Sequence, residues 1–365
     1  MVIFVVTKDI EENKFVNKSE NLMTRVYMIC ITLVAIMAIG ALIIYIINDN
    51  KNVNSKTVSN KVQANNSKTD SEENDEISEN SDNTGNDDLN SVDGLKTLIK
   101  DYMSEGKGTI DMLREIYPEN IVVYDNNKFV FMPVDDSLEK NSIDKDCLRK
   151  LESGEIVYEK DEEVTSIKGI DVSKYQGEID WEKVAKDGVE YAIIRLGYRG
   201  YGTGAIVLDE NALKNIEGAT KAGIDVGVYF FSQAITEAEG VEEAEFVLEK
   251  IKGYDISYPI VFDTEDVYGE DARADSLSKS ERTDIAIAFC DTIEEAGYTP
   301  VVYANLKWFT LSLDMSRLEK YDKWFAYYDD EIYFPYEIDI WQYSESGQVS
   351  GIEGPVDMNI SFKEW

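Results

Sequence analysis

The sequence predicts an α/β protein whose C-terminal part is an irregular TIM-like (β/α) barrel with about five βα units and extra closing strands. From residue 168 onward, apolar runs of strand length alternate with helical patterns, which is typical of a parallel sheet covered on both faces. After residue 305 the helical patterns shorten and strand patterns dominate. An irregular barrel therefore fits these roughly 200 residues, and a doubly wound open sheet is the competing architecture.

Ahead of the barrel, residues 26–47 form an uncharged run, "VYMICITLVAIMAIGALIIYII". As a helix this run would be about 33 Å long, enough to cross a bilayer. It is longer than a buried core helix would need, and no small-residue cleavage site follows it, as a signal peptide requires. We therefore predict a single transmembrane helix, with residues 1–25 as a separate N-terminal segment whose basic residues do not decide the orientation.

The segments between this helix and the barrel differ in composition. Residues 48–91 are rich in Asn, Ser, Asp and Glu and nearly lack aromatic residues, so they are predicted to be a disordered acidic linker. Residues 92–165 show two short amphipathic helical patterns and a hairpin pattern that turns at Asn126 and Asn127. We expect a small accessory α+β region there, and no motif in it points to a chemistry.

Residues 166–365 supply the barrel. The predicted strands are 169–172, 191–197, 225–231, 258–263 and 299–305, followed by 323–328, 338–344 and 354–361. The predicted helices are 180–188, 209–223, 236–253 and 278–297, and several of them end at glycine, the expected C-terminal stop.

Composition excludes several classes of function. The chain has 72 acidic and 36 basic residues, a formal net charge of −36, which disfavours a nucleic acid partner because phosphate contacts need Lys and Arg. It contains no histidine, so catalytic triads and HExxH zinc sites are excluded. Its three cysteines show no CxxC spacing. If the protein is an enzyme, its proton chemistry runs on carboxylates.

Four carboxylates occur at the predicted strand ends. Asp171 follows "GI", Asp263 and Glu265 follow "PIVF", and Asp357 follows "GPV". The carboxyl ends of parallel strands carry the site in such folds, so these side chains should meet. Neighbouring buried carboxylates raise one another's pKa, which suits glycosidic bond cleavage because that reaction needs a protonated acid. The alternatives are helix caps and surface ion pairs, or an oxygen-rich Mg²⁺ or Ca²⁺ site.

Aromatic residues also gather at or just beyond the predicted strand ends, where a sugar could lie against them. Core packing accounts for about half of such residues in any barrel, so composition alone does not say which of them line a groove. The set comprises Tyr229, Tyr303, Trp308, Trp324, Tyr327, Tyr328, Trp341 and Tyr343.

The motifs of the barrel occur in a recognisable order. "GIDVSKYQGEIDW" (169–181), "YPIVFDTED" (258–266) and "IDIWQYSESGQVSGIEGPVDMNI" (338–360) resemble the family 25 glycoside hydrolases, muramidases that cut peptidoglycan between N-acetylmuramic acid and N-acetylglucosamine. The shorter runs "YAIIRLGYRGYG", "VGVYFF", "VVYAN" and "KWFAYY" lie between them in the same order. The resemblance covers about residues 168–365 and almost nothing before them.

The resemblance implies roles for single residues. Glu265 would be the general acid that protonates the leaving glycosidic oxygen, and Asp263 would orient and polarise the N-acetyl group of the substrate. Asp171 and Asp357 would shape the subsite and tune this pair. The aromatic residues that resemble the family's sugar contacts are Tyr303, Trp324, Tyr328 and Trp341. A further candidate for a sugar contact is Tyr229.

The resemblance also implies an extracytoplasmic enzyme without a cofactor or metal, acting on peptidoglycan strands in wall remodelling or lysis. The N-terminus would then be cytoplasmic, and residues from about 48 onward would lie outside the membrane. The rival hypothesis is an inactive barrel that binds wall glycan through its aromatic residues. A family 18-like chitinase would need a DxxDxDxE run, of which "SYPIVFDTE" supplies only the last DxE.

Overall fold

The computed structural model describes residues 92–267 and 271–365. The predictions for residues 1–25, 26–47 and 48–91 therefore concern segments outside the described residues. Within the two described ranges, no helix is both long enough and apolar enough to cross a membrane.

Eight strands close into a barrel, because β6 pairs with β14 on one side and with β7 on the other. The predicted TIM-like barrel with an irregular close is confirmed. The strands of the barrel, in chain order, are β6 (Ile167–Val172), β7 (Tyr191–Arg199), β9 (Asp225–Phe231), β10 (Ile260–Asp263), β11 (Pro300–Asn305), β12 (Asp322–Ala326), β13 (Ile340–Gly347) and β14 (Val356–Ser361). A short strand, β8 (Ile206–Leu208), pairs with β7 outside this circle.

The closure is irregular because the last strand runs backwards. The pairs from β6 through β13 are parallel, whereas β14 is antiparallel to both β13 and β6. No helix separates β12 from β13 or β13 from β14. An antiparallel strand needs no long crossover, so a short connection is enough to complete the barrel.

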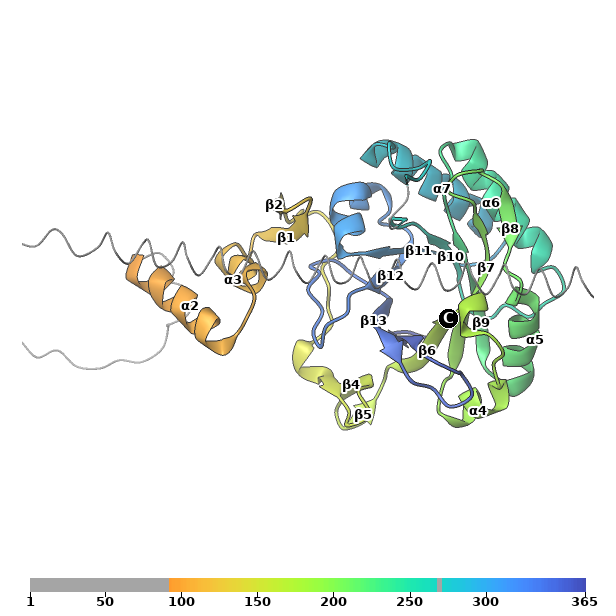
Figure 1. The fold of residues 1–365 in the computed structure, drawn as a ribbon, viewed down its shortest axis with the longest axis horizontal. Coiled ribbons are helices and arrows are strands. Elements are labelled where there is room, and N and C mark those ends of the chain that lie inside the picture. The colour runs from red at the N-terminus through yellow and green to blue at the C-terminus, as the bar shows by residue number, and fades with distance from the viewer. Residues whose placement is uncertain (1–91, 268–270) are drawn as a thin grey trace, which may run out of the picture. The chain divides into compact units, whose positions relative to one another are not determined.

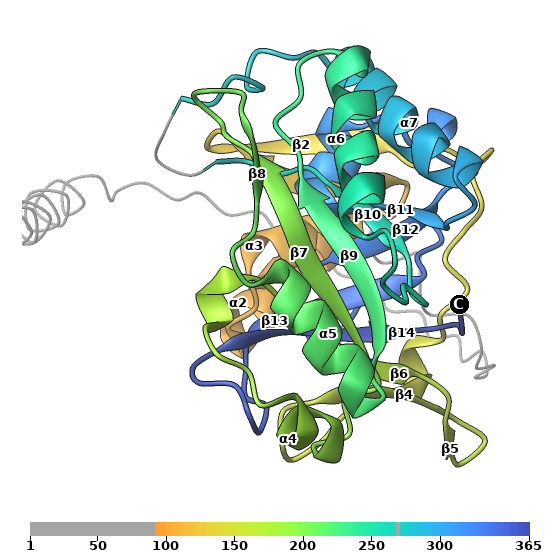
Figure 2. The ribbon, with the colours of Figure 1, turned by 90° about the vertical axis from the view of Figure 1, so that its right-hand side faces the viewer.

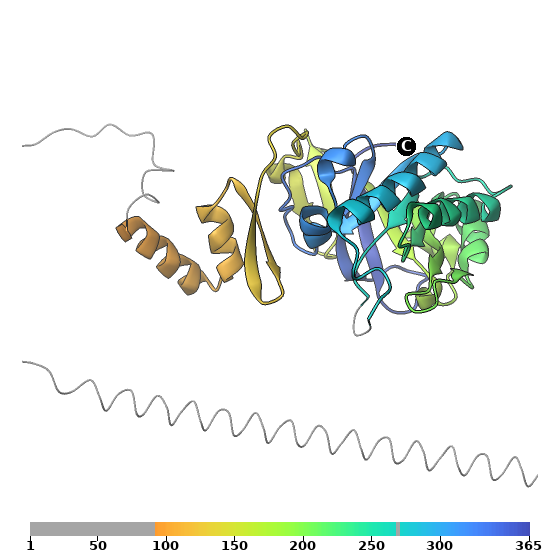
Figure 3. The same cartoon turned by 90° about the horizontal axis from the view of Figure 1, so that it is seen from above.

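Helices cover the outer face of the parallel strands. They are α4 (Trp181–Lys186), α5 (Ala212–Ala222), α6 (Glu237–Lys250) and α7 (Lys279–Glu295), with short turns at η2 (Lys174–Gln176), η3 (Trp308–Ser312) and η4 (Met315–Arg317). Figure 2 shows α5 and α6 against β7 and β9, and Figure 3 shows α6 beside α7. Ser278 caps α7 in a capping box with Glu281, and α5 ends at Gly223 in the left-handed conformation, which glycine adopts without strain.

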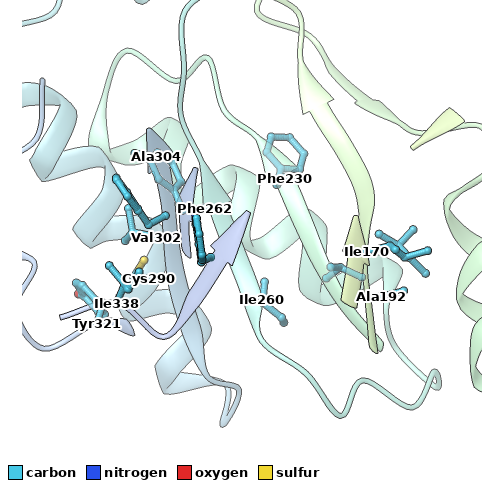
Figure 4. Packing of buried hydrophobic residues seen from close by; sticks show 14 of the residues in the cluster. Ile170, Ala192, Phe230, Ile260, Phe262, Cys290, Val302, Ala304, Tyr321 and Ile338 are labelled. Carbon is cyan, nitrogen blue, oxygen red and sulfur yellow. The ribbon is translucent and has the colours of Figure 1, made fainter. Parts of the chain in front are cut away.

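Alternation along each strand separates two apolar layers. Ile260 and Phe262 of β10 point outward into the layer beneath the helices, where they meet residues such as Phe230 and Cys290 (Figure 4). Val261 points the other way, into a smaller cluster inside the barrel. Successive side chains of a strand lie on opposite faces, so Asp263 continues the inward row of Val261.

The barrel interior is filled by tyrosine at the end opposite to the carboxylates. The ring of Tyr191 stacks on Tyr258 with 4.4 Å between the ring centroids, and both side chains are buried. Gly169 makes room for this ring, because a Cβ atom there would lie 2.1 Å from Tyr191 Cζ. The glycine of the "GID" motif is thus a packing requirement of the interior.

The region before the barrel contains the two expected helices, α2 (Val92–Glu105) and α3 (Thr109–Ile116), and the expected hairpin, β1 (Asn120–Asp125) with β2 (Lys128–Pro133) (Figure 1). The hairpin turns at Asn126 and Asn127, which have φ of 48° and 60° as a type I′ turn requires. Further on lie η1 (Lys145–Cys147), β3 (Leu148–Lys150), β4 (Ile156–Lys160) and β5 (Glu163–Val164).

This region has no separate core. Ile121 and Val123 of β1, with Leu138 and Ile156, belong to the same apolar cluster as the outer layer of the barrel. Residues 121–156 therefore pack as an extension of the barrel rather than around a centre of their own, whereas α2 and α3 contain no buried residue.

Candidate active site

The structure brings the four predicted carboxylates to one end of the barrel. Asp171 lies near the end of β6, Asp263 ends β10, and Glu265 follows two residues later. These three and Asp357 line one cavity of about 150 Å³. Asp263 and Glu265 share a face because they are two residues apart in extended chain.

Asp357 reaches this cavity by a route that the strand pattern did not predict. We expected it at the end of a strand, but it is the second residue of β14. Because β14 is antiparallel to β6, its first residues lie where β6 ends, and Asp357 is the direct partner of Asp171 across that pair. The reversed strand therefore delivers its carboxylate to the same rim from the opposite direction.

Asp171 is held by amide donors. Its Oδ2 accepts hydrogen bonds from Gln342 Nε2 at 2.7 Å and from Asn359 Nδ2 at 2.9 Å. Trp324 Nε1 donates to Asn359 Oδ1 at 2.8 Å and so fixes which end of that amide faces Asp171. Burial raises the pKa of Asp171 to about 6, although the two amide hydrogen bonds favour its charged form.

Asp171 and Asp357 influence each other's ionisation through a hydrogen bond. Burial, followed by the charge of Asp171, raises the pKa of Asp357 to about 9. A hydrogen bond between the two side chains raises the pKa of Asp357 and lowers that of Asp171, which makes Asp357 the donor. At neutral pH the pair thus carries its proton on Asp357 and its negative charge on Asp171.

Glu265 has the properties of a general acid near neutral pH. Burial raises its pKa to about 7, and the charges of Asp171 and Asp266 act in the same direction. Asp263 is also fully buried, and burial and the charge of Glu265 raise its pKa, whereas Arg195 lowers it. Asp263 Oδ1 has no hydrogen-bond partner among the described residues. A buried acceptor without a partner is costly, so a substrate N–H group would be a favourable occupant.

Four of the five predicted aromatic contacts line the cavity: Tyr229, Tyr303, Trp324 and Tyr328. The hydroxyls of Tyr303 and Tyr328 both donate to Gln342 Oε1, at 2.9 and 3.0 Å. Gln342 therefore connects the two tyrosines to Asp171.

Trp341 does not line the cavity, contrary to its predicted sugar contact. Its ring has no exposed surface and lies in the outer apolar layer, with Nε1 donating to Tyr327 O at 2.8 Å. The alternation of β13 places the next residue, Gln342, in the cavity instead.

Glu265 lies in the cavity and Asp266 lies outside it, paired with Lys307 at 2.8 Å.

Two residues that line the cavity, Gln342 and Glu345, were not predicted as site residues. A third residue that was not predicted, Asn359, does not line the cavity but donates a hydrogen bond to Asp171. Gln342 directly follows the buried Ile340 and Trp341 in β13, Asn359 lies between the buried Met358 and Ile360 in β14, and the two amides are Cα partners across the β13–β14 pair. An amide inside a buried strand was the signal in the sequence, because such a group needs a hydrogen-bond partner.

No group of three or more His, Cys, Asp or Glu side chains in the described ranges has the geometry of a metal site. Asp171 instead pairs with two amides and with Asp357. In chemical terms, the site offers a buried acid, an adjacent carboxylate with a free acceptor atom, and tyrosine and tryptophan rings. These are the chemical groups that glycosidic bond cleavage requires.

An α/β barrel with a buried acid and neighbouring carboxylates at the end where its parallel strands finish has the architecture of a glycoside hydrolase. A family model described as glycosyl hydrolases family 25 matches residues 170–352. The chain belongs to that family. The matched segment contains Asp171, Asp263 and Glu265, and Asp357 lies five residues beyond its end.

Curated relatives and solved structures carry the same domain. The chain is 27% identical over 200 residues to the autolytic lysozyme of Clostridium acetobutylicum, covering 53% of this chain and 55% of that one. It is 26% identical over 208 residues to lysozyme M1 of Streptomyces globisporus, covering 54% and 68%. The modular autolysin LytC of Streptococcus pneumoniae is similar in structure, with a TM-score of 0.50 and 28% identity over 66% of this chain. That match spans about half of the autolysin, 51% of its length.

Proposed function

We propose that the protein is a peptidoglycan muramidase that hydrolyses the β-1,4 bond between N-acetylmuramic acid and N-acetylglucosamine. The observation that carries the proposal is Glu265, buried at the barrel mouth beside Asp263 with a pKa raised to about 7. The lysozymes among the relatives support the same substrate class.

In the proposed reaction, Glu265 donates its proton to the glycosidic oxygen as the bond to the sugar breaks. Positive charge then grows on the anomeric carbon. Asp263 Oδ1, which has no partner among the described residues, accepts a hydrogen bond from the N-acetyl N–H of the substrate. This contact turns the acetyl oxygen toward the anomeric carbon, to which it bonds as the glycosidic bond breaks. A water molecule then displaces the acetyl oxygen at that carbon and gives its proton to the Glu265 carboxylate, which restores the acid. Asp171 and Asp357 contribute one negative charge in place of two, which keeps Glu265 protonated without excessive repulsion.

The test is digestion of purified peptidoglycan with the full chain, followed by mass spectrometry of the new reducing ends. New N-acetylmuramic acid ends are expected. New N-acetylglucosamine ends would overturn the proposed linkage, and glycan that is bound without any new ends would favour the rival hypothesis of an inactive binding module. Glu265→Gln should lower kcat by at least about a thousandfold, because it removes the proton donor. Glu182→Gln, an exposed carboxylate on α4, is the matched control.

We further propose that residues 26–47 anchor the enzyme in the cell membrane, with the N-terminus cytoplasmic and the barrel extracytoplasmic. The support is the length of the uncharged run and the location of the substrate outside the membrane. The full chain should stay with the membrane fraction after washing at high salt and alkaline pH. Protease added to intact protoplasts should remove the barrel. A barrel that is found in the soluble fraction, or that is protected in intact protoplasts, would contradict this placement.

A further inference from the structure

A second, larger cavity adjoins the catalytic one. It has a volume of about 440 Å³ and shares Glu265, Tyr303, Tyr328 and Glu345 with the smaller cavity, so the two form one continuous depression. The barrel contributes one side of the larger cavity. The other side comes from the region before the barrel, through Ile110, Arg114, Val123 and Tyr124.

The wall contributed by β1 is fixed to the barrel. Val122 N donates to the Tyr333 hydroxyl at 3.0 Å, and that hydroxyl donates to Asn120 O at 3.1 Å. Ile121 and Val123 are both 3% exposed. A wall held by backbone hydrogen bonds and buried side chains is already formed before a ligand arrives, which lowers the entropic cost of binding.

The cations of the cavity are already neutralised by protein groups. Lys307 Nζ pairs with Asp266 at 2.8 Å and with Asp125 at 3.2 Å. Arg114 Nη1 pairs with Asp111 Oδ1 at 3.7 Å and donates to the Tyr327 hydroxyl at 2.7 Å, and the guanidinium lies 3.8 Å from the centroid of the Tyr333 ring. These contacts leave little free positive charge, so the cavity does not suit a phosphate or another anion.

Two aromatic rings remain available in the cavity. Tyr124 is 54% exposed and Tyr328 is 51% exposed, although both are large residues that could have been buried. Tyr124 comes from the hairpin and Tyr328 from the loop after β12. Rings of this kind cover the C–H faces of sugars, and their hydroxyls can bond sugar oxygens.

We propose that the larger cavity is an additional subsite, in which Tyr124 binds a sugar of the same glycan strand beyond the two sugars joined by the cleaved bond. The inference rests on the proposed muramidase function and extends it. Residues 92–134 thereby become part of the substrate site, and the enzyme prefers long glycan strands over short ones.

The test compares two substrates for the full chain. One is peptide-free glycan strands, and the other is the disaccharide N-acetylmuramyl-N-acetylglucosamine, which contains only the cleaved bond. Tyr124→Ala should lower the ratio of kcat/KM for strands to kcat/KM for the disaccharide by about five- to tenfold, mainly through KM. Tyr124→Phe, which keeps the ring, should retain most of the ratio.

Phe131→Ala is the matched control. Phe131 lies on the same hairpin and is 38% exposed, its ring packs on Tyr117 and not on Tyr124, and it does not line the cavity. Phe131→Ala should leave the ratio within about twofold of the wild-type value, since it removes a ring of similar size without touching the ligand. An equal drop for both substrates in Tyr124→Ala, an unchanged ratio, or an equal effect of Phe131→Ala would overturn the subsite.

Failure of the proposed muramidase function can be distinguished from failure of the proposed subsite. If the wild type cleaves neither substrate, the muramidase proposal falls, and binding decides the subsite. Fluorescence titration of glycan strands would then compare Glu265→Gln with the double variant Glu265→Gln/Tyr124→Ala. A five- to tenfold weaker Kd in the double variant, about the effect expected from one lost ring, supports the subsite. Equal Kd values overturn it.

Discussion

Glu265 is surrounded by negative charge, and this environment decides the pH range in which it can act. Burial and the charges of Asp171 and Asp266 raise its pKa to about 7. A general acid must be protonated, so kcat should fall as the pH rises through about 7.

Substitution of Asp266 should move this pH limit without changing a residue that lines the catalytic cavity. Its charge favours the protonated form of Glu265, so Asp266→Asn should lower the pKa of Glu265 and move the alkaline limb of the kcat profile to lower pH. The released Lys307 acts in the same direction. The measurement is a pH–kcat profile on glycan strands, with the exposed Glu294→Gln as control. A limb that stays in place or moves to higher pH would contradict this account of Glu265.

Asp357 should make stability depend on pH. Its folded pKa of about 9 lies far above the ordinary value of 3.8 for an aspartic acid side chain. The contribution of Asp357 to the free energy of unfolding is therefore largest at acid pH and is lost as the pH rises toward 9. Asp357→Asn keeps a donor for Asp171 and removes the ionisation, so it should raise Tm at pH 8 by about 2–4 °C or more, and by less at pH 5. Thermal melts at the two pH values test this, and an equal change at both would contradict it.

The sequence predicted four of the five carboxylates of the cavity, and it missed Glu345 and the amide partners of Asp171. A carboxylate that interrupts an apolar strand is conspicuous, so Asp171, Asp263, Glu265 and Asp357 were predicted and they meet in one cavity. Gln342 and Asn359 contact Asp171 across 171 and 188 residues of chain. Contacts of that range depend on barrel closure, which local patterns do not contain.

At the level of single elements, β6 is constrained by what lies beside it inside the barrel. Gly169→Ala places a Cβ atom 2.1 Å from Tyr191 Cζ, and that ring is fully buried against Tyr258. We expect a loss of about 2–3 kcal/mol in the free energy of unfolding. The matched control is Gly202→Ala, where a Cβ atom would meet nothing within 4 Å. Chemical denaturation checks both, and a loss of stability equal to that of the control would contradict the packing argument.

Local turn chemistry and the alternation of side chains along a strand explain which predictions about single elements were right. The hairpin at Asn126 and Asn127 was predictable because its turn chemistry is local. Trp341 was assigned to the substrate because aromatic residues suit sugars, yet its neighbour Gln342 occupies the cavity. A strand carries its residues to two faces, and only the register of β13 against β12 and β14 decides which face is inside.

At the level of the whole described chain, the barrel followed from the alternation of strands and helices, whereas the role of residues 92–134 did not. Their contacts with the barrel join residues far apart in the chain, 182 positions for Asp125 and Lys307 and 211 for Val122 and Tyr333. No short motif marks such a contact. Once made, it places Tyr124 beside the catalytic cavity through buried neighbours in β1.

This arrangement predicts a gradient of local stability that hydrogen exchange of the full chain can measure. Helix α2 has no buried residue, so its amides should exchange through local opening. Strand β1 shares the apolar cluster of the barrel, so its amides should exchange about as slowly as those of β10. Equal, fast exchange throughout residues 92–134 would show that the hairpin opens independently of the barrel.

Tyr333 connects these two parts, so its hydroxyl should control the exchange of β1. Tyr333→Phe removes the acceptor for Val122 N and the donor for Asn120 O, at a cost of about 1–2 kcal/mol. Exchange in β1 should then be about five- to thirtyfold faster, whereas exchange in β10 stays the same. Tyr336→Phe is the control, because its hydroxyl accepts from Asp135 N and does not contact β1. If exchange in β10 accelerated equally, the hairpin and the barrel would open as one unit, and the cavity wall could not loosen without loss of the whole site.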